Sequence, residues 1–371
     1  MKKKSNMSMG KRIVRRLKQM IGMRVNTQLR ETRPGTPPED EDVLLKIDDL
    51  TITFEVDGDV VQAVTDVSLE VKKGKTLGLV GETGAGKTTT ALASLNMVPD
   101  PPGVIHKGHV WVCGENILTK TPGQLEMIRG TDIAMIFQDP MTSLNPVMTV
   151  GDQIAEGISI HEKISRKEAY VKAQKMLEVV GIPGERAKDY PHQFSGGMKQ
   201  RVVIAIALSC NPKILIADEP TTALDVTIQA QVLDLMHDLR DKYDMGMIMI
   251  THDLGIVAES CDDVAVMYAG RIIEKGTLDE VFNDTRHPYT EGLFNSLPNI
   301  QDRQARLKPI PGLMPDPANL PKGCAFADRC AYATDACREA IPEQRWITDT
   351  HVVACSRYNE PDFMIERSKK A

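Results

Sequence analysis

The chain has 371 residues, of which 42% are hydrophobic and 26% are charged, and its formal net charge is −6. These are ordinary values for a globular protein, with room for one large domain and appendages. No apolar run in the sequence approaches the ~20 residues that a transmembrane helix needs, so we do not expect the chain to span a membrane. The N-terminus lacks the apolar core of a secretory signal, so we expect a cytoplasmic protein whose cysteines are not paired in disulfides.

The N-terminal extension, residues 1–44, differs in composition from the rest of the chain. Residues 1–30 contain ten Lys and Arg and no Asp or Glu. On a helix, the apolar residues would share one face: Ile13, Leu17, Met20 and Ile21. This pattern suits a helix lying on an anionic bilayer, and a disordered basic tail is an equally good interpretation. RNA binding is a weaker one, because the arm has no aromatic residues for base stacking. A proline-rich acidic linker over residues 34–42 follows.

A glycine-rich segment separates an apolar strand, predicted over residues 76–80, from a helix predicted over residues 89–95. In this context the pattern G-x-x-x-x-G-K-[ST] binds phosphate, and the residues that carry it here are Gly81, Glu82, Thr83, Gly84, Ala85, Gly86, Lys87, Thr88 and the following Thr89. Glycines let backbone N–H groups close around phosphates, and the helix N-terminus adds positive potential. Lys87 is expected to neutralise the β- and γ-phosphates, and Thr88 to bind Mg²⁺. The alternative, a chance glycine-rich turn, would rarely stand between a strand and a helix.

Residues 140–210 are predicted to be mostly helical, for example over residues 166–180. Near the end of this region, Ser195, Gly196 and Gly197 open a helical run that continues to residue 208. A Ser-Gly-Gly helix start is a second anion-binding device. One triphosphate bound within one chain does not need two such devices.

Four apolar residues followed by two acids, residues 214–219, predict a buried central strand with a polar tip. Asp218 at that tip would hold Mg²⁺, mostly through water, and Glu219 would polarise the attacking water. A core strand with a solvated acidic turn is the alternative, which the upstream phosphate loop makes the weaker one.

The order of these segments resembles that of the ATP-binding subunits of ABC transporters, over about residues 45–283. The resemblance is carried by the phosphate loop, Gln138, the Ser-Gly-Gly helix start, Asp218 with Glu219, the Thr-Ala-Leu-Asp run at residues 222–225, and His252. It implies an α/β fold. That fold is a P-loop ABC ATPase domain over residues 45–285, with a RecA-like core and a helical signature subdomain at about 140–210. Residues 45–56 and 68–71 would form an antiparallel β edge, and residues 264–274 a late hairpin.

The resemblance also implies roles for single residues. Gln138 would contact Mg²⁺ and report the nucleotide state to a membrane partner, and His252 would reach the γ-phosphate. Asp225 would lie at a dimer seam, and the helix that begins at Ser195 would close on the ATP held by the partner subunit. Phe194 and Met198 depart from the family pattern, but the serine hydroxyl and the glycines that form the signature remain, so we expect it to be active. Phe54 is the candidate for stacking on adenine, and a core position is almost as good an interpretation.

The C-terminal part, residues 286–371, narrows the resemblance. It contains His287-Pro-Tyr-Thr290, the proline-rich residues 309–321 and a cysteine-rich segment from Gly323, while residues 139–146 read Asp-Pro-Met-Thr-Ser-Leu-Asn-Pro. These features resemble the ATPase subunits of bacterial oligopeptide and dipeptide importers and of relatives that import nickel or other solutes. The resemblance implies a heterodimer with a paralogous ATPase beneath two transmembrane permease subunits, supplied by an external solute-binding protein. The chain would then be a peripheral protein on the cytoplasmic face of the membrane and would bind no nucleic acid. A generic regulatory extension is the alternative.

Four of the seven cysteines lie in the last 48 residues: Cys324, Cys330, Cys337 and Cys355. Clustered thiols in a reducing compartment suggest a metal site. Structural zinc favours C-x₂₋₄-C pairs, which these spacings lack, whereas iron–sulfur clusters are held by four thiolates at more variable spacings. The family resemblance implies a [4Fe–4S] cluster; zinc and four unliganded thiols stay open. The remaining cysteines, Cys113, Cys210 and Cys261, are interpreted as core or incidental residues.

Two other classes of function compete with a transporter ATPase. A soluble ABC ATPase of DNA repair or translation would usually carry a long coiled-coil insertion or two ATPase domains. Residues 81–195 are too short for the insertion, and the sequence has one phosphate loop. A non-enzymatic regulator is disfavoured because Lys87, Glu219 and His252 are all present.

Overall fold

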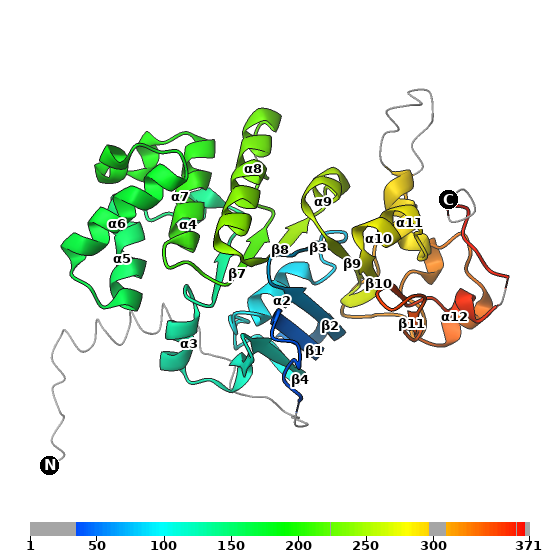
Figure 1. Cartoon of the computed structure of the whole chain (residues 1–371). Coiled ribbons are helices and arrows are strands. Elements are labelled where there is room, and N and C mark those ends of the chain that lie inside the picture. Colours follow the sequence, from blue (N-terminus) through cyan, green and yellow to red (C-terminus); the bar gives the residue numbers. More distant parts are fainter. Residues whose placement is uncertain (1–34, 223, 297–308, 361, 368–371) are drawn as a thin grey trace, which may run out of the picture.

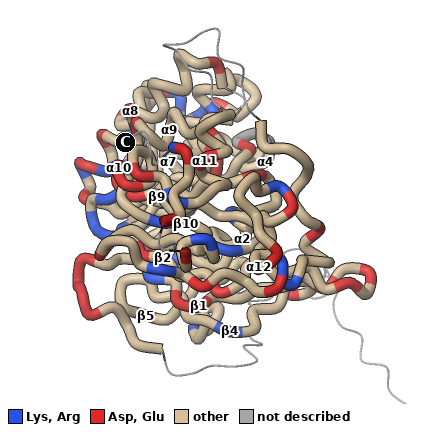
Figure 2. The backbone as a smooth tube through the Cα atoms, turned by 90° about the vertical axis from the view of Figure 1, so that its right-hand side faces the viewer, with Lys and Arg blue, Asp and Glu red and all other residues tan. Residues whose placement is uncertain are grey.

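The structure is a computed structural model that describes residues 35–222, 224–296, 309–360 and 362–367. The basic arm predicted over residues 1–30 lies outside the described residues. Within them, no helix combines the length and apolarity needed to cross a bilayer. Figure 2 shows Lys and Arg interspersed with Asp and Glu in that view of the backbone, rather than gathered on one side.

An eight-stranded sheet forms the centre of the molecule, in the order β11-β12-β10-β9-β3-β8-β7-β6 (Figure 1). Its five parallel strands are β6 (Ile133–Ile136), β7 (Ile214–Asp218), β8 (Gly246–Thr251), β3 (Thr76–Val80) and β9 (Asp263–Tyr268). These strands are almost wholly buried, as expected for apolar runs covered on both faces. The predicted strands before the phosphate loop and before Glu219 are confirmed.

A second, antiparallel sheet of four strands packs beside α2 (Lys87–Ala93), with β1 (Val43–Val56) and β2 (Asp59–Lys72) as its longest strands. Its other strands are β4 (Gly103–Val112) and β5 (Glu115–Asn116). One hydrophobic cluster joins this sheet, α2 and the central sheet through side chains such as Ile52, Ala91 and Ile250. The predicted antiparallel edge is confirmed, and it lies against the helix that follows the phosphate loop. Further along the chain come η1 (Ile117–Thr119) and α3 (Pro122–Ile128).

The region between Gln138 and β7 is helical, as predicted. It contains α4 (Pro140–Ser143), α5 (Val150–Glu162), α6 (Arg166–Val179) and α7 (Gly196–Leu208), with the short turns η2 (Gly184–Lys188) and η3 (Pro191–Gln193). Helix α6 begins with a capping box, in which Ser165 and Glu168 each satisfy a backbone N–H at the start of the helix. Helices α8 (Val226–Tyr243) and α9 (Leu254–Ser260) follow β7 and β8.

The C-terminal extension returns to the central sheet. After the predicted hairpin of β9 and β10 (Arg271–Thr277) come α10 (Leu278–Asn283) and α11 (Pro288–Asn295). Two short strands, β11 (Arg345–Trp346) and β12 (Val352–Val353), then extend the sheet, because β12 pairs antiparallel with β10. The pieces η4 (Ala327–Arg329), α12 (Asp335–Glu339) and η5 (Ser356–Asn359) complete the extension.

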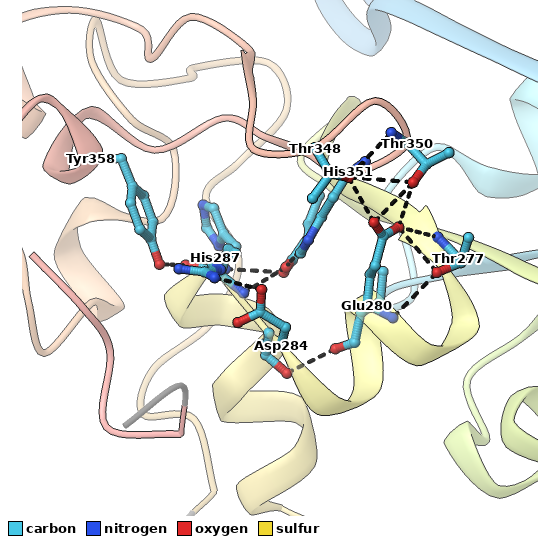
Figure 3. Close-up of polar contacts among 12 residues, drawn as sticks. Thr277, Glu280, Asp284, His287, Thr348, Thr350, His351 and Tyr358 are labelled. Carbon is cyan, nitrogen blue, oxygen red and sulfur yellow. Dashed lines mark hydrogen bonds and ion pairs between the residues drawn. The ribbon is translucent and has the colours of Figure 1, made fainter. Parts of the chain in front are cut away.

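Buried polar contacts fasten the extension to the hairpin (Figure 3). The carboxylate of Glu274 accepts hydrogen bonds from the backbone N–H groups of Arg286 and His287, at 2.6 and 3.0 Å, and it lies 3.0 Å from Nε2 of His351. Glu274 and His351 are both fully buried. Nearby, Glu280 accepts hydrogen bonds from three threonines, Thr277, Thr348 and Thr350. The extension therefore shares a polar core with the sheet.

Candidate nucleotide site

The loop between β3 and α2 has a backbone that glycine alone accommodates at key points. Gly81, Gly84 and Gly86 all have positive φ, and Gly86 precedes α2 directly with φ 102°. A Cβ at Gly86 would stand 2.3 Å from the carbonyl oxygen of Ala63. The loop can therefore curve tightly above the helix N-terminus, which is the geometry that phosphate binding requires.

Lys87 lies over this loop, with 7% of its surface exposed. Its Nζ donates hydrogen bonds to the carbonyl oxygens of Gly81, at 2.6 Å, and of Glu82, at 3.0 Å. Burial lowers the pKa of Lys87, while the nearby carboxylates of Glu219, Asp218 and Glu82 oppose that shift. A buried ammonium that faces the loop interior can exchange these carbonyl contacts for phosphate oxygens.

Thr88 and Asp218 meet beside Lys87. Oγ1 of Thr88 donates to Oδ2 of Asp218 at 2.8 Å, and Asp218 ends β7 with only 3% of its surface exposed. Burial raises the pKa of Asp218, although the hydrogen bond from Thr88 counteracts this effect. A hydroxyl and a carboxylate oxygen next to a phosphate cradle are the ligands that Mg²⁺ prefers, so these two residues fit the ion.

Glu219 is the centre of a small network. Its Oε2 accepts hydrogen bonds from Nε2 of Gln138, at 2.8 Å, and from Oγ1 of Thr222, at 3.0 Å, and its Oε1 lies 3.2 Å from Nδ1 of His252. Burial alone would raise the pKa of Glu219, but the contacts with His252 and Thr222 outweigh it, so the pKa lies below its ordinary value. A carboxylate that stays ionised can accept a proton from water.

These residues line one pocket. Its walls are formed by Phe54, Val61, Ala63, Thr83, Gly84, Gly86, Lys87, Thr88, Thr89, Gln138, Glu219, His252 and Pro317. Phe54 is partly buried against the core cluster and also lines this pocket, so its stacking on adenine stays a prediction. Among the predicted loop residues, Gly81, Glu82 and Ala85 are not among the lining residues; nor is Asp218, which contacts Thr88.

Sequence reasoning missed four contributors. Val61, Ala63 and Pro317 line the pocket, and Thr222 binds Glu219. Pro317 belongs to the proline-rich run and Thr222 to the Thr-Ala-Leu-Asp run, which both indicate the family resemblance but not a contact with the pocket. Val61 and Ala63 belong to a mostly apolar run, residues 60–64, whose sequence does not indicate that two of its side chains line the pocket.

Ser195, Gly196, Gly197 and Asp225 do not line this pocket. Ser195 caps α7 by accepting a hydrogen bond from the Met198 N–H, and Asp225 caps α8 in the same way. The two helix starts touch, because a Cβ at Gly197 would stand 2.5 Å from Cγ2 of Ile228. The second predicted anion-binding device is therefore a helix start separate from the pocket of its own chain.

The four clustered cysteines line a second, small cavity. Cys324, Cys330, Cys337 and Cys355 share it with residues that include His287 and Phe326. Burial raises the pKa of Cys330 to about 11 and that of Cys355 to about 12. Across the described ranges, no group of three or more His, Cys, Asp or Glu side chains has the arrangement of a metal site. The four thiols thus converge on one cavity, and binding a metal there would require them to lose their protons.

Comparison with known proteins places the chain. Residues 64–222 match the family described as ABC transporter, and residues 273–337 match the one described as oligopeptide/dipeptide transporter, C-terminal region. The oligopeptide transport ATP-binding protein OppD of Bacillus subtilis is 52% identical over 313 residues, 84% of this chain and 87% of that protein. The chain belongs to the ABC transporter family. It is an ATPase of that family's ATP-binding type.

A further relative and a solved structure support the same family assignment. The dipeptide transport ATP-binding protein DppD of Bacillus subtilis is 48% identical over 314 residues, 84% of this chain and 94% of that protein. Among solved structures, the dimeric post-hydrolysis state of the ATP-binding cassette MJ0796 bound to ADP and Pi is similar, with a TM-score of 0.56 and 25% identity. The match covers 63% of this chain and 98% of that one. The predicted fold class is confirmed for the ATPase part.

Proposed function

We propose that this ABC ATPase powers the import of oligopeptides or dipeptides. The peptide class is supported by the resemblance to OppD and DppD and by the matching C-terminal region over residues 273–337. The observation that carries the catalytic part is the network around Glu219, which unites Gln138, Thr222 and His252 opposite Lys87. The nickel importer and the DNA-repair or translation ATPase are less well supported, because OppD and DppD are both peptide transport proteins.

In the proposed reaction, Lys87 and the loop N–H groups hold the β- and γ-phosphates, and Thr88 and Asp218 hold Mg²⁺. The metal would neutralise phosphate charge. Glu219 orients a water molecule and accepts its proton as the oxygen attacks the γ-phosphorus. The bond to the oxygen shared with the β-phosphate breaks, and ADP leaves with that oxygen. His252 would contact the γ-phosphate, and Gln138, which donates to Glu219 in the structure, would be a further residue able to contact the metal.

We also propose that hydrolysis needs two subunits. The supporting observation is that Ser195, Gly196 and Gly197 start a helix away from the pocket of their own chain. A partner's helix start would then supply N–H groups to the nucleotide held here, with Asp225 at the seam. The partner would be a paralogous ATPase. Two membrane permease subunits and an external solute-binding protein would complete the importer, with this chain on the cytoplasmic face of the membrane.

The four cysteines are proposed to hold a [4Fe–4S] cluster, with zinc as the alternative. Support comes from their convergence on one cavity. Such a group would be structural, because none of the four thiols lines the nucleotide pocket. The three-part division at residues 44 and 285 remains a prediction as well.

The function can be tested by reconstitution. The chain would be purified with the membrane subunits and paralogous ATPase that co-purify with it, and placed in proteoliposomes with the external binding protein. We expect ATP-dependent uptake of labelled peptides that is lost in Lys87→Ala. Uptake of nickel without peptide uptake would contradict the peptide proposal while keeping the ATPase. Co-purification with ribosomes in place of membrane subunits would contradict the transporter.

A further inference from the structure

The proline-rich segment of the C-terminal extension lies along the rim of the nucleotide pocket. Pro317 is one of the residues that line this pocket, and its carbonyl oxygen accepts a hydrogen bond from the N–H of Gln62 at 2.9 Å. Met314 touches the phosphate loop, because its Cε stands 3.2 Å from the place where a Cβ of Gly84 would be. Residues more than 220 positions away in the sequence therefore form part of the wall of the site.

Arg329 of the same extension is anchored behind the loop. Its Nη1 donates to Oε2 of Glu82 at 3.0 Å and to the hydroxyl of Tyr268 at 3.1 Å. Its Nε donates to the carbonyl oxygen of Pro311 at 2.9 Å, which ties the proline-rich segment to the same side chain. Only 8% of the Arg329 side chain is exposed. A guanidinium held at three points keeps one geometry, and it presents its charge to the loop.

Glu82 connects this cation to the phosphate-binding lysine. Its carbonyl oxygen accepts from Nζ of Lys87, its N–H donates to the hydroxyl of Tyr289 at 2.9 Å, and its carboxylate is held by Arg329. Glu82 is also the one acidic residue in the glycine-rich loop itself, residues 81–88. An unbalanced carboxylate at this point would repel the phosphates that the loop has to hold, and a partly buried charge is poorly screened.

We propose that Arg329 is a positioning residue of the nucleotide site, through which the C-terminal extension neutralises Glu82 and fixes the phosphate loop for ATP. The inference rests on the nucleotide site proposed above and adds the extension to it. Repulsion by an unpaired Glu82 grows with the charge of the ligand, so loss of Arg329 weakens the binding of ATP more than that of ADP. Removal of the Glu82 charge then restores the nucleotide affinity that is lost with Arg329.

The test measures binding to the full-length chain by calorimetry, with the Mg²⁺ complexes of a non-hydrolysable ATP analogue and of ADP. We expect Arg329→Ala to weaken binding of the ATP analogue about tenfold, a normal size for coupling between sites. Binding of ADP should weaken by less. The double variant with Glu82→Gln should recover most of the lost affinity, and Arg329→Lys should fall between. The matched control is Arg338→Ala, an exposed arginine of the same extension whose ion pairs involve Asp328 and Asp335.

The outcomes separate the inference from the site on which it rests. If Lys87→Ala abolishes nucleotide binding while Arg329→Ala changes the affinity for neither the ATP analogue nor ADP, the inference is wrong and the nucleotide site stands. If Lys87→Ala binds normally, the nucleotide site itself is wrong. Thermal unfolding is recorded for every variant. An equal loss of ATP and ADP affinity that Glu82→Gln does not rescue would mean that Arg329 only stabilises the fold, and it would overturn the inference.

Discussion

Gln138 and Glu219, 81 positions apart, are joined by a hydrogen bond of 2.8 Å from Nε2 to Oε2. Both residues have proposed partners elsewhere, the metal for Gln138 and the attacking water for Glu219. Because the carboxylate accepts from Gln138 and Thr222 while it faces His252, side chains of this chain hold it in one orientation. Exchange of the Gln138 contact would couple nucleotide binding to the loop that follows β6.

The first prediction concerns this carboxylate. Glu219→Gln keeps the size of the side chain and its contacts but cannot accept a proton, so the variant should bind ATP and hydrolyse it about 10²–10⁴-fold more slowly. Turnover and ATP affinity would be measured in the assembled complex, where the slow variant should accumulate as a closed dimer. Lys87→Ala is the contrasting control, since it should weaken binding. Turnover near that of the unaltered protein would rule out Glu219 as the base.

The second prediction concerns completion of the site by a partner. Ser195→Arg places a large cation at the start of α7 and should abolish hydrolysis at the partner's nucleotide. ATP binding at Lys87 should remain, because Ser195 does not line that pocket. The assay compares ATP binding with turnover over a range of protein concentrations. Hydrolysis by a monomer that is fast and independent of concentration would disprove the need for a second subunit.

The third prediction concerns the cysteine cavity. Protein purified without oxygen should be brown and contain about four irons per chain if the four thiols hold a cluster. Cys330→Ser should remove the colour and lower the stability of the extension, while Cys113→Ser, outside the cavity, should change neither. Metal analysis decides between the alternatives. Stoichiometric zinc without iron would indicate a zinc site in place of the cluster. Absence of both metals would indicate four unliganded thiols.

The fourth prediction concerns acid stability. Burial alone would raise the pKa of Glu280, but hydrogen bonds from Thr348, Thr277 and Thr350 outweigh it and lower the pKa from 4.5 to about 2. A depressed carboxyl pKa stabilises the folded state above the unfolded pKa, and that contribution disappears as pH falls from about 4.5 towards 2. Glu280→Ala should therefore destabilise the protein at neutral pH, with a difference that shrinks below pH 4.5.

Urea unfolding at several pH values would measure this difference. The matched control is Glu339→Ala, an exposed glutamate of the C-terminal extension. A difference between Glu280→Ala and the unaltered protein that stays constant down to pH 3 would contradict the assignment.

The fifth prediction concerns the basic arm, whose structure is outside the described residues. Deletion of residues 1–24 should reduce binding to anionic liposomes in a salt-sensitive manner and leave nucleotide affinity unchanged. Sedimentation with liposomes of defined anionic content is the measurement. If the shortened chain sediments as well as the full chain, the membrane-surface interpretation is wrong and the disordered tail remains.

The nucleotide motifs could be predicted because each is a local pattern whose spacing reflects one strand, one turn and one helix. Lys87 and Thr88 lie at the start of the helix that follows the phosphate loop. Gln138 and Glu219 lie just after the strands β6 and β7. Contacts that join distant segments left no such pattern. The hydrogen bond between Arg329 and Glu82 spans 247 positions, and nothing in a proline-rich, cysteine-rich tail indicates that it reaches the phosphate loop.

The addition of the extension to the central sheet has a consequence for solubility. Without residues 340–360, strand β10 would present a row of unpaired N–H and C=O groups to solvent, and the buried Glu274 would lose His351. Unprotected edges of this kind recruit strands from other molecules. In the described chain the outermost strand, β11, has only two residues and carries Arg345, which makes it a poor template for further strands. The extension therefore covers this edge of the sheet, and forms of the protein that end before residue 340 are expected to aggregate.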